Sequence, residues 1–223
     1  MSVSATAVDR IPAPSPPPLR QLQDFVGRTV SSLGARYLAD QSSAVAQMAR
    51  LRRAVADAPG ADPGTWSVVL QDFPERLVGR TDDANRYEQA AHSAICLFAV
   101  HQQARSANMH LALSGGLGRA VRRLGSGTPS EEATLRRFRA LATASSYRET
   151  MHHLRGLISQ LRAESIPLNY AQLAVDLAQL QTPGDADRVR LRWGRDYHRQ
   201  ARNESGASST VEDKSTTAAT LPA

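Results

Sequence analysis

Apolar residues recur every three or four positions along most of this chain, and that spacing constrains the fold more than any other feature. A helix turns once in about 3.6 residues, so this period places apolar side chains on one helical face. No run has the alternating period of a half-buried strand. The chain has 223 residues, 41% of them hydrophobic, which is enough for a packed core. The sequence therefore predicts an all-α fold, a compact bundle of about eight helices with short connections.

Several of the expected helices begin at recognisable cap sequences. Thr128-Pro129-Ser130-Glu131 has the spacing of a capping box, with proline in the first helical position. Asn169 with Gln172 has similar spacing, and Thr182-Pro183 marks the start of the last helix. A loop is expected at 58–64. The predicted helices cover residues 19–39, 43–56, 83–106, 129–143, 147–163, 169–180 and 183–201.

Both ends of the chain differ in composition from the middle. Residues 1–18 are rich in Ala, Ser and Pro, which predicts an extended, disordered arm. Residues 203–223 are rich in Ser, Thr and Ala, which predicts a disordered tail. The length between them fits one domain or two small subdomains that share a core. The expected subdomains are residues 19–110 and 111–202.

Arginine provides nearly all of the positive charge. Of the 27 basic residues only Lys214 is a lysine, and the net charge is +6. Guanidinium groups make planar, two-pronged contacts to phosphate, so this balance favours nucleic acid or another anionic surface as partner. A solvated helix face usually explains a single charge cluster, but repeated clustering favours nucleic acid. The clusters are Arg50/Arg52/Arg53, Arg119/Arg122/Arg123, Arg136/Arg137/Arg139, Arg188/Arg190/Arg192 and Arg195/Arg199/Arg202.

The last expected helix carries two different stripes. Apolar residues at intervals of four predict a face that docks on the bundle. A second stripe consists of arginines, whose mutual repulsion a bound anion would relieve. Local pairing with neighbouring aspartates is the alternative, and the sequence leaves both open. The apolar residues are Val189, Trp193 and Tyr197; the arginines are Arg188, Arg192, Arg195 and Arg199; the aspartates are Asp185, Asp187 and Asp196.

The chain lacks the sequence patterns of an enzyme or a metalloprotein. Gly116-Leu117-Gly118 begins like a dinucleotide fingerprint, but Val121 occupies the place of the third glycine and no strand precedes it. We expect a loop there, leading into a short helix. Cys96 is the only cysteine and lies in an apolar run, which predicts a buried thiol. We find no metal-ligand spacing, P-loop or nucleophile elbow, so we expect no metal, no cofactor, no catalytic residues and no enzymatic activity.

Two further expectations concern the partner and the location. Aromatic residues make up only 5% of the chain, too few for a platform that stacks many bases, which favours contacts to phosphate over recognition of bases. No stretch approaches the ~20 apolar residues that span a bilayer. The N-terminal sequence also lacks the pattern of a signal peptide. We therefore expect a cytoplasmic protein.

Several segments, in this order, resemble the CasB family, the small subunit of Cascade, the type I-E CRISPR surveillance complex. Each segment is weak alone, but their order and spacing are specific, and together they cover residues 33–199. The segments are Met48-Ala49-Arg50-Leu51-Arg52-Arg53-Ala54 with Pro59 and Trp66, Leu97 to Gln103, Leu117-Gly118-Arg119-Ala120 with Leu124, Leu135-Arg136-Arg137-Phe138, His153 to Leu157, Ile166 to Tyr170, Leu173 to Leu177, and Trp193-Gly194-Arg195-Asp196-Tyr197.

The resemblance implies an all-helical fold of two small subdomains without enzymatic activity. It implies a role in antiviral defence, with two copies of the chain lying against the backbone subunits that carry the CRISPR RNA, and with the large subunit as a further partner. A basic face would bind the displaced single strand of the target DNA and steady the R-loop, whose formation is nearly balanced in energy. The predicted nucleic-acid-binding residues, from the resemblance and the clusters, are Arg52, Arg53, Arg86, Arg119, Arg122, Arg136, Arg137, Arg195 and Arg199.

Two other classes of protein stay open. One is a free-standing helical DNA-binding regulator, although no recognition helix after a tight turn is evident. The other is a structural assembly subunit whose arginines pair with acidic surfaces of its partners.

Overall fold

The computed structural model describes the backbone of residues 16–207 and the side chains of residues 16–199. The predicted arm up to residue 15 and the predicted tail from residue 208 lie outside this range. Within it the chain forms nine α-helices and three short 3-10 turns. Its only strand-like pairing is an isolated bridge between His110 and Leu168. The predicted all-α class is confirmed.

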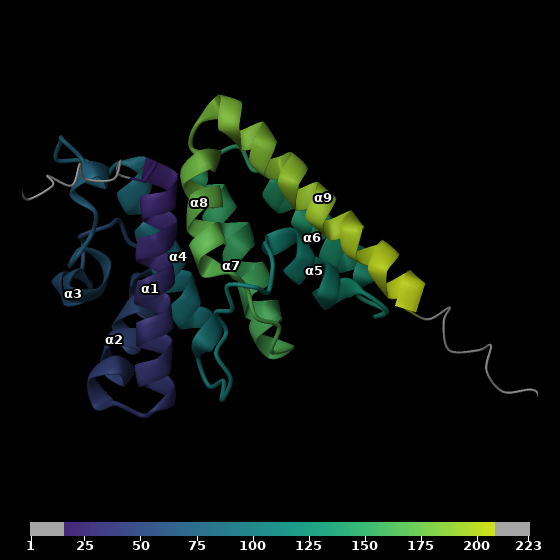
Figure 1. Cartoon of the computed structure of the whole chain (residues 1–223), viewed down its shortest axis with the longest axis horizontal. Helices are drawn as coiled ribbons and strands as arrows, with labels where there is room; N and C mark the ends of the chain where they lie inside the picture. Colours follow the sequence, from purple (N-terminus) through teal and green to yellow (C-terminus); the bar gives the residue numbers. More distant parts are fainter. Residues whose placement is uncertain (1–15, 208–223) are drawn as a thin grey trace, which may run out of the picture.

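Figure 1 shows the helices in three groups, side by side along the long axis. One end consists of α1 (Pro18–Leu38), α2 (Ser42–Arg53) and α3 (Trp66–Val69), with 3-10 turns at 54–56, 63–65 and 75–77. The middle consists of α4 (Arg86–Gln102), α7 (Tyr147–Ala163) and α8 (Tyr170–Leu180). The other end consists of α5 (Leu117–Gly125), α6 (Glu131–Ala142) and α9 (Pro183–Ala207).

Helix α4 is the central element of the core. Every residue from Ala90 to Gln102 is buried, because α1, α2, α7 and α8 all pack around it. The side chain of Asn85 accepts hydrogen bonds from the backbone of the first turn, and Glu88 closes the capping box. This cap fixes the start of α4, and the chain leaves the helix at Gln103. The helix predicted over 83–106 is therefore shorter at both ends.

Helix α7 covers the predicted range. The predicted cap of α8 is confirmed, since the Asn169 side chain accepts from the Gln172 backbone N–H at 3.0 Å. The capping box predicted at Thr128 and Glu131 is wrong. The Thr128 hydroxyl donates to the Gly125 carbonyl at 2.9 Å, and the Glu131 carboxylate accepts from Arg122 instead. Helix α6 consequently begins at Glu131 rather than at Pro129.

Helices α5 and α9 pack closely against each other. A Cβ atom added at Gly118 would lie 2.2 Å from the Trp193 carbonyl oxygen, so only glycine permits this approach. The predicted docking face of α9 is confirmed, since Val189, Trp193 and Tyr197 are all buried. Helix α9 continues past Asn203 to Ala207, so residues 203–207 of the predicted tail are helical.

Two expectations about single features were also tested. Cys96 is fully buried, as predicted. The loop predicted at 58–64 is followed by a 3-10 turn and by α3, which the sequence analysis missed. No helix within residues 16–207 has the length and apolar character to cross a membrane.

Candidate nucleic-acid interface

The predicted binding arginines divide into two groups by exposure. Four of them are half-buried and lie against other parts of the chain: Arg52, Arg86, Arg119 and Arg122. The others are exposed and form no ion pair within residues 16–199: Arg53, Arg136, Arg137, Arg195 and Arg199. The second group therefore offers the more exposed guanidinium groups to a partner.

Arg86 and Arg122 join elements of the fold. The Arg86 guanidinium donates to the Thr182 hydroxyl between α8 and α9, and it lies 4.8 Å from the ring centroid of Tyr87. Arg122 donates to Glu131 at 2.7 Å and so ties α5 to α6. Both contacts occupy the donors that a phosphate would need. We therefore leave these two residues out of the candidate interface.

The arginine stripe of α9 also divides. Arg188 donates to Asp185 at 2.9 Å, which confirms the alternative of local pairing at this position. Arg192 donates at 2.6 Å to Asp176 of α8, a partner that the sequence analysis did not consider. Arg195 and Arg199 keep exposed guanidinium groups. Arg192 thus ties α9 to α8, whereas Arg188 pairs locally at the surface and Arg195 and Arg199 face solvent.

Asp176 explains why Arg192 turns inward. Its carboxylate is buried and also accepts from the Trp193 indole N–H at 2.6 Å and from the Gln172 amide at 2.8 Å. Burial raises the pKa of Asp176, and Arg192, Trp193 and Gln172 oppose that shift. A buried carboxylate requires such partners, because an unpaired charge in the core is costly. The network fixes α9 on α8.

A crevice between α5, α6 and the end of α7 is lined by two exposed arginines, one from the predicted set and one from a neighbouring cluster position. Its volume is about 460 Å³, and Arg123 and Arg137 both line it. Hydroxyl groups, the Gln160 amide and one carboxylate complete the polar lining. Guanidinium and hydroxyl donors together are the groups that contact phosphate oxygens in nucleic-acid complexes. The hydroxyl groups belong to Thr128, Ser130 and Thr134, and the carboxylate to Glu164.

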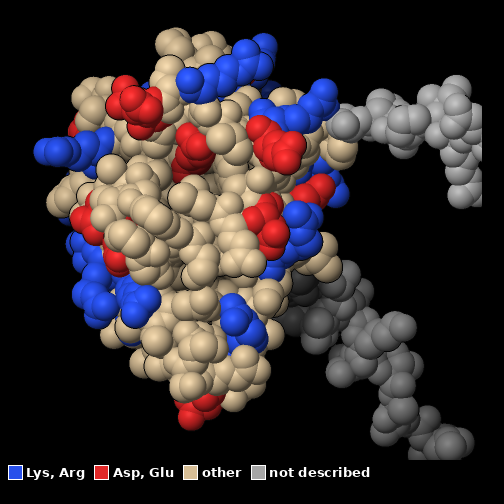
Figure 2. All heavy atoms as spheres, turned by 90° about the vertical axis from the view of Figure 1, so that its left-hand side faces the viewer, with Lys and Arg blue, Asp and Glu red and all other residues tan. Residues whose placement is uncertain are grey.

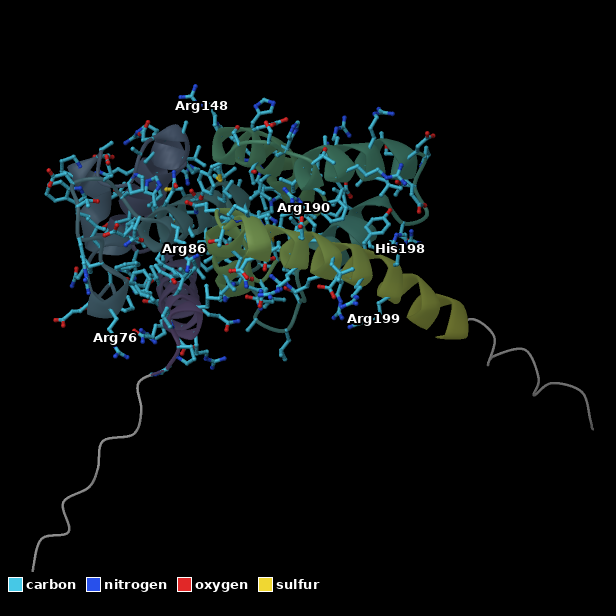
Figure 3. All side chains as sticks on the ribbon, turned by 90° about the horizontal axis from the view of Figure 1, so that it is seen from above. Arg76, Arg86, Arg148, Arg190, His198 and Arg199 are labelled. Atoms are coloured by element: carbon cyan, nitrogen blue, oxygen red, sulfur yellow. The ribbon has the colours of Figure 1, made fainter. Side chains whose placement is uncertain are left out.

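The predicted residues do not all lie on one patch. Arg53 ends α2, at the end of the molecule opposite to α9 (Figure 1). In Figure 3, Arg148 of α7 and Arg199 of α9 lie on opposite sides, and Arg86 lies between them. Arg119 folds back toward the loop before α5, since its Cδ would lie 2.7 Å from a Cβ atom at Gly115. Of the predicted set, Arg137 lines the crevice between α5, α6 and α7.

The end formed by α1, α2 and α3 has a different surface character. Figure 2 shows basic and acidic residues interspersed there around a broad uncharged area. Large apolar side chains are exposed on these helices, among them Trp66, Leu70 and Val45. An even mixture of charges attracts a polyanion less than a surface of one sign. The candidate interface therefore lies on the other two groups of helices.

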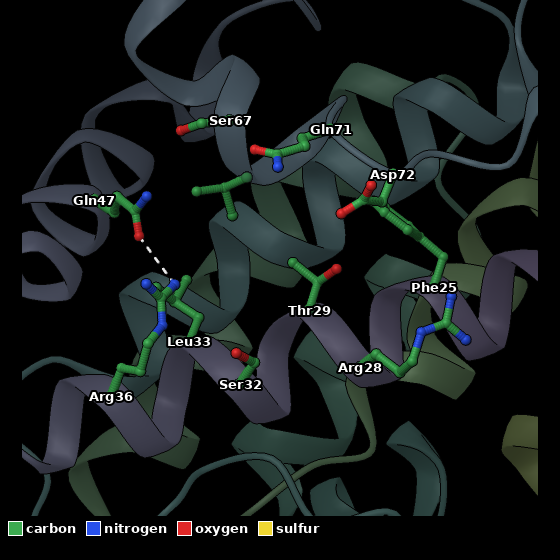
Figure 4. Close-up of a pocket in the computed structure, with 11 residues that line it drawn as sticks. Phe25, Arg28, Thr29, Ser32, Leu33, Arg36, Gln47, Ser67, Gln71 and Asp72 are labelled. Carbon is green, nitrogen blue, oxygen red and sulfur yellow. Dashed lines mark hydrogen bonds between the residues drawn. The ribbon is translucent and has the colours of Figure 1, made fainter.

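A separate hollow of about 390 Å³ lies between α1 and the segment around α3 (Figure 4). Arg28 and Arg36 line it from α1, and Asp72 faces them. Arg36 donates to the Gln47 amide oxygen at 3.1 Å, so part of its hydrogen-bonding capacity is used within the chain. We assign this hollow no place in the interface.

The sequence analysis missed exposed basic residues on α7. Arg148, His152 and Arg155 are exposed and line one further crevice. Their spacing of four and three residues places them on one face of the helix. This helical spacing was the signal in the sequence that could have identified them.

Comparison with known proteins identifies a family and several solved structures that resemble this chain. The family model described as CRISPR-associated protein Cse2 matches residues 47–198. The solved structure of CasB from Thermobifida fusca is 36% identical, with a TM-score of 0.67 over 80% of this chain and 98% of that one. No curated protein matches the chain.

Two more distant structures share the fold. A chain of a structure titled CRISPR RNA-guided surveillance complex is 22% identical, with a TM-score of 0.66 over 84% of this chain and 99% of that one. CasB from M. ruber is 24% identical, with a TM-score of 0.61 over 84% and 98% of the two chains.

Proposed function

Because this chain belongs to the family of CRISPR-associated protein Cse2, the CasB family that its sequence resembles, we propose that it is a non-catalytic small subunit of an RNA-guided surveillance complex. The complex would be of type I-E and act in antiviral defence. Its partners would be the backbone and large subunits, a second copy of this chain, the CRISPR RNA and the target DNA.

We further propose that its free arginines bind the backbone of the displaced DNA strand and stabilise the R-loop. The observation that carries this step is the crevice where Arg123 and Arg137 lie with three hydroxyl side chains. Such a lining suits phosphate and offers no aromatic ring for a base. Binding there would depend on charge and on salt concentration more than on sequence.

The first prediction concerns this crevice. In the full-length protein, Arg123→Ala with Arg137→Ala should weaken binding of single-stranded DNA. The slope of log K against log salt concentration should flatten by about 0.7 per lost phosphate contact, hence by about 1.4 for both. The melting temperature should barely change, because both side chains are exposed. In the assembled complex, guide RNA loading should persist while the R-loop lifetime shortens.

A matched control removes the same charge elsewhere. Arg76→Ala with Arg80→Ala changes two exposed arginines that form no ion pair within residues 16–199. It should leave the salt slope and the R-loop lifetime unchanged. Equal slopes for both double variants and the wild type would contradict the proposal. The arginines would then be surface charge or contacts to partner subunits.

A further inference from the structure

A second crevice lies between the N-terminal half of the chain and α7. Its volume is about 580 Å³, within the range of about 300–1,000 Å³ that is usual for small-molecule sites. Residues 55–59 form one wall, the first turns of α4 form the floor, and one face of α7 forms the other wall. Sequence-distant segments thus converge on one hollow.

The walls combine apolar surface with fixed hydrogen-bonding groups. Val55, Pro59 and Met151 are buried or half-buried and give apolar surface. The Tyr147 hydroxyl lies 2.9 Å from the Ser93 hydroxyl and 3.3 Å from the Gln89 carbonyl oxygen, so its aromatic ring is held in place. Burial raises the pKa of Tyr147, which keeps the phenol protonated as a donor.

One polar group of the lining is free for a ligand. The side-chain amide of Gln89 forms no hydrogen bond to any residue within the described range, although it lines the crevice. An amide can donate and accept at once, which suits the hydrogen-bonding edge of a nucleobase. The crevice between α5 and α6 has no such combination of amide and aromatic ring.

The rim of the crevice is cationic. Arg148, His152 and Arg155 are exposed on the same face of α7, and neither arginine forms an ion pair within residues 16–199. Arg148 points away from the body of the molecule in Figure 3. Arg148 and Arg155 are seven positions apart, which spans about 10 Å of helix. Asp57 on the opposite wall contributes one carboxylate against the two guanidinium groups.

We propose that this crevice binds one unpaired nucleotide of a single strand, with its base against Tyr147 and its flanking phosphates on Arg148 and Arg155. The inference rests on the proposed function, since it assumes that the chain contacts single strands. It adds a site for a base to a surface that would otherwise contact only phosphates. Base stacking of this kind tolerates any sequence, because every base has a flat π-face.

The experiment compares two single strands of equal length and charge, one normal and one with abasic residues throughout. The full-length protein should bind the normal strand at least about fivefold more tightly, as expected for a single stacked base. Gln89→Ala should weaken binding of the normal strand by about threefold and leave abasic binding unchanged. Gln71→Ala, at an exposed glutamine that lines the separate hollow beside α1, should change neither affinity.

A charge variant tests the rim. Arg148→Ala with Arg155→Ala should weaken binding of both strands and flatten the salt slope by about 1.4. The control is again Arg76→Ala with Arg80→Ala. Photo-crosslinking to a strand that carries 5-iododeoxyuridine should modify Tyr147 or Met151.

The possible failures can be told apart. If the wild type does not bind single strands, the proposed function fails and this inference fails with it. If it binds them through Arg123 and Arg137, but binds abasic strands equally well and does not depend on Arg148 and Arg155, only this crevice loses its role. An acidic segment of a partner protein would then be the better occupant.

Discussion

His101 is a titratable residue held in the middle of the core. Its ring is fully buried, and its Nδ1 atom lies 2.8 Å from the Tyr170 hydroxyl. Burial lowers the pKa of His101 to about 4, from an ordinary value of 6.5. The folded protein therefore keeps this imidazole neutral at a pH where the unfolded chain would protonate it.

This shift predicts a loss of stability in acid. Below pH 6.5 the unfolded chain binds a proton at His101. The folded chain binds this proton only when the pH falls to about 4. The free energy of unfolding should therefore fall across this window by about 3 kcal/mol from this residue. His101→Gln removes the titration, so its stability should fall less steeply with pH, although it starts lower at pH 7.

Urea denaturation at a series of pH values measures both quantities. The matched control is His198→Gln, because His198 is exposed on α9. The control should keep the steep acid dependence of the wild type. If His101→Gln kept it as well, the neutral state of His101 would not be the cause.

At the scale of elements, the contact between α5 and α9 depends on one glycine. Because Gly118 faces the backbone of Trp193, a methyl group there overlaps a carbonyl oxygen that cannot rotate away. Gly118→Ala should therefore force the helices apart and lower the free energy of unfolding by about 1–3 kcal/mol. Thermal or urea denaturation measures the change.

Helix α7 offers the control for this substitution. Gly156 is exposed there, and a Cβ atom added to it would meet nothing within 4 Å. Gly156→Ala should raise stability by about 0.5–1 kcal/mol, because alanine is the better helix former. Equal effects of the two substitutions would show that helix propensity, rather than the close contact with α9, decides the result at Gly118.

Elements also show which features the sequence could predict. The apolar period located α7 and the docking face of α9, because periodicity depends only on neighbours along the helix. It missed α3, because four residues are too few to show a period. It could not separate Arg188 and Arg192 from Arg195 and Arg199, because Asp176 approaches Arg192 only in the folded chain.

At the scale of the molecule, the candidate site also combines features that the sequence could predict with features that arise only in the folded chain. The clusters singled out Arg136 and Arg137 as residues that a partner could reach, and both are exposed. The crevices depend on residues that are distant in sequence, such as Arg123 with Glu164 or Asp57 with Arg155. No spacing along the chain encodes those pairs. The division into subdomains 19–110 and 111–202 stays a prediction.

The packing nevertheless predicts how the whole molecule unfolds. Helix α8 comes from the second predicted subdomain but packs on α1 and α4 of the first. One cluster of buried apolar residues runs from Leu22 to Tyr197. A chain restricted to residues 16–207 should therefore melt in a single cooperative transition at the wild-type temperature. Calorimetry provides the measurement.

A shorter chain that ends at residue 182 provides the contrast. It loses α9, and with it the buried side chains of Val189, Trp193 and Tyr197. Asp176 would also lose the Arg192 and Trp193 donors that compensate its burial. This chain should melt at a much lower temperature or fail to fold, since α5, α6 and α8 would expose to water the apolar surface that α9 covers. Two separate transitions in the 16–207 chain would instead mean that the subdomains unfold independently and that α8 contributes little to joining them.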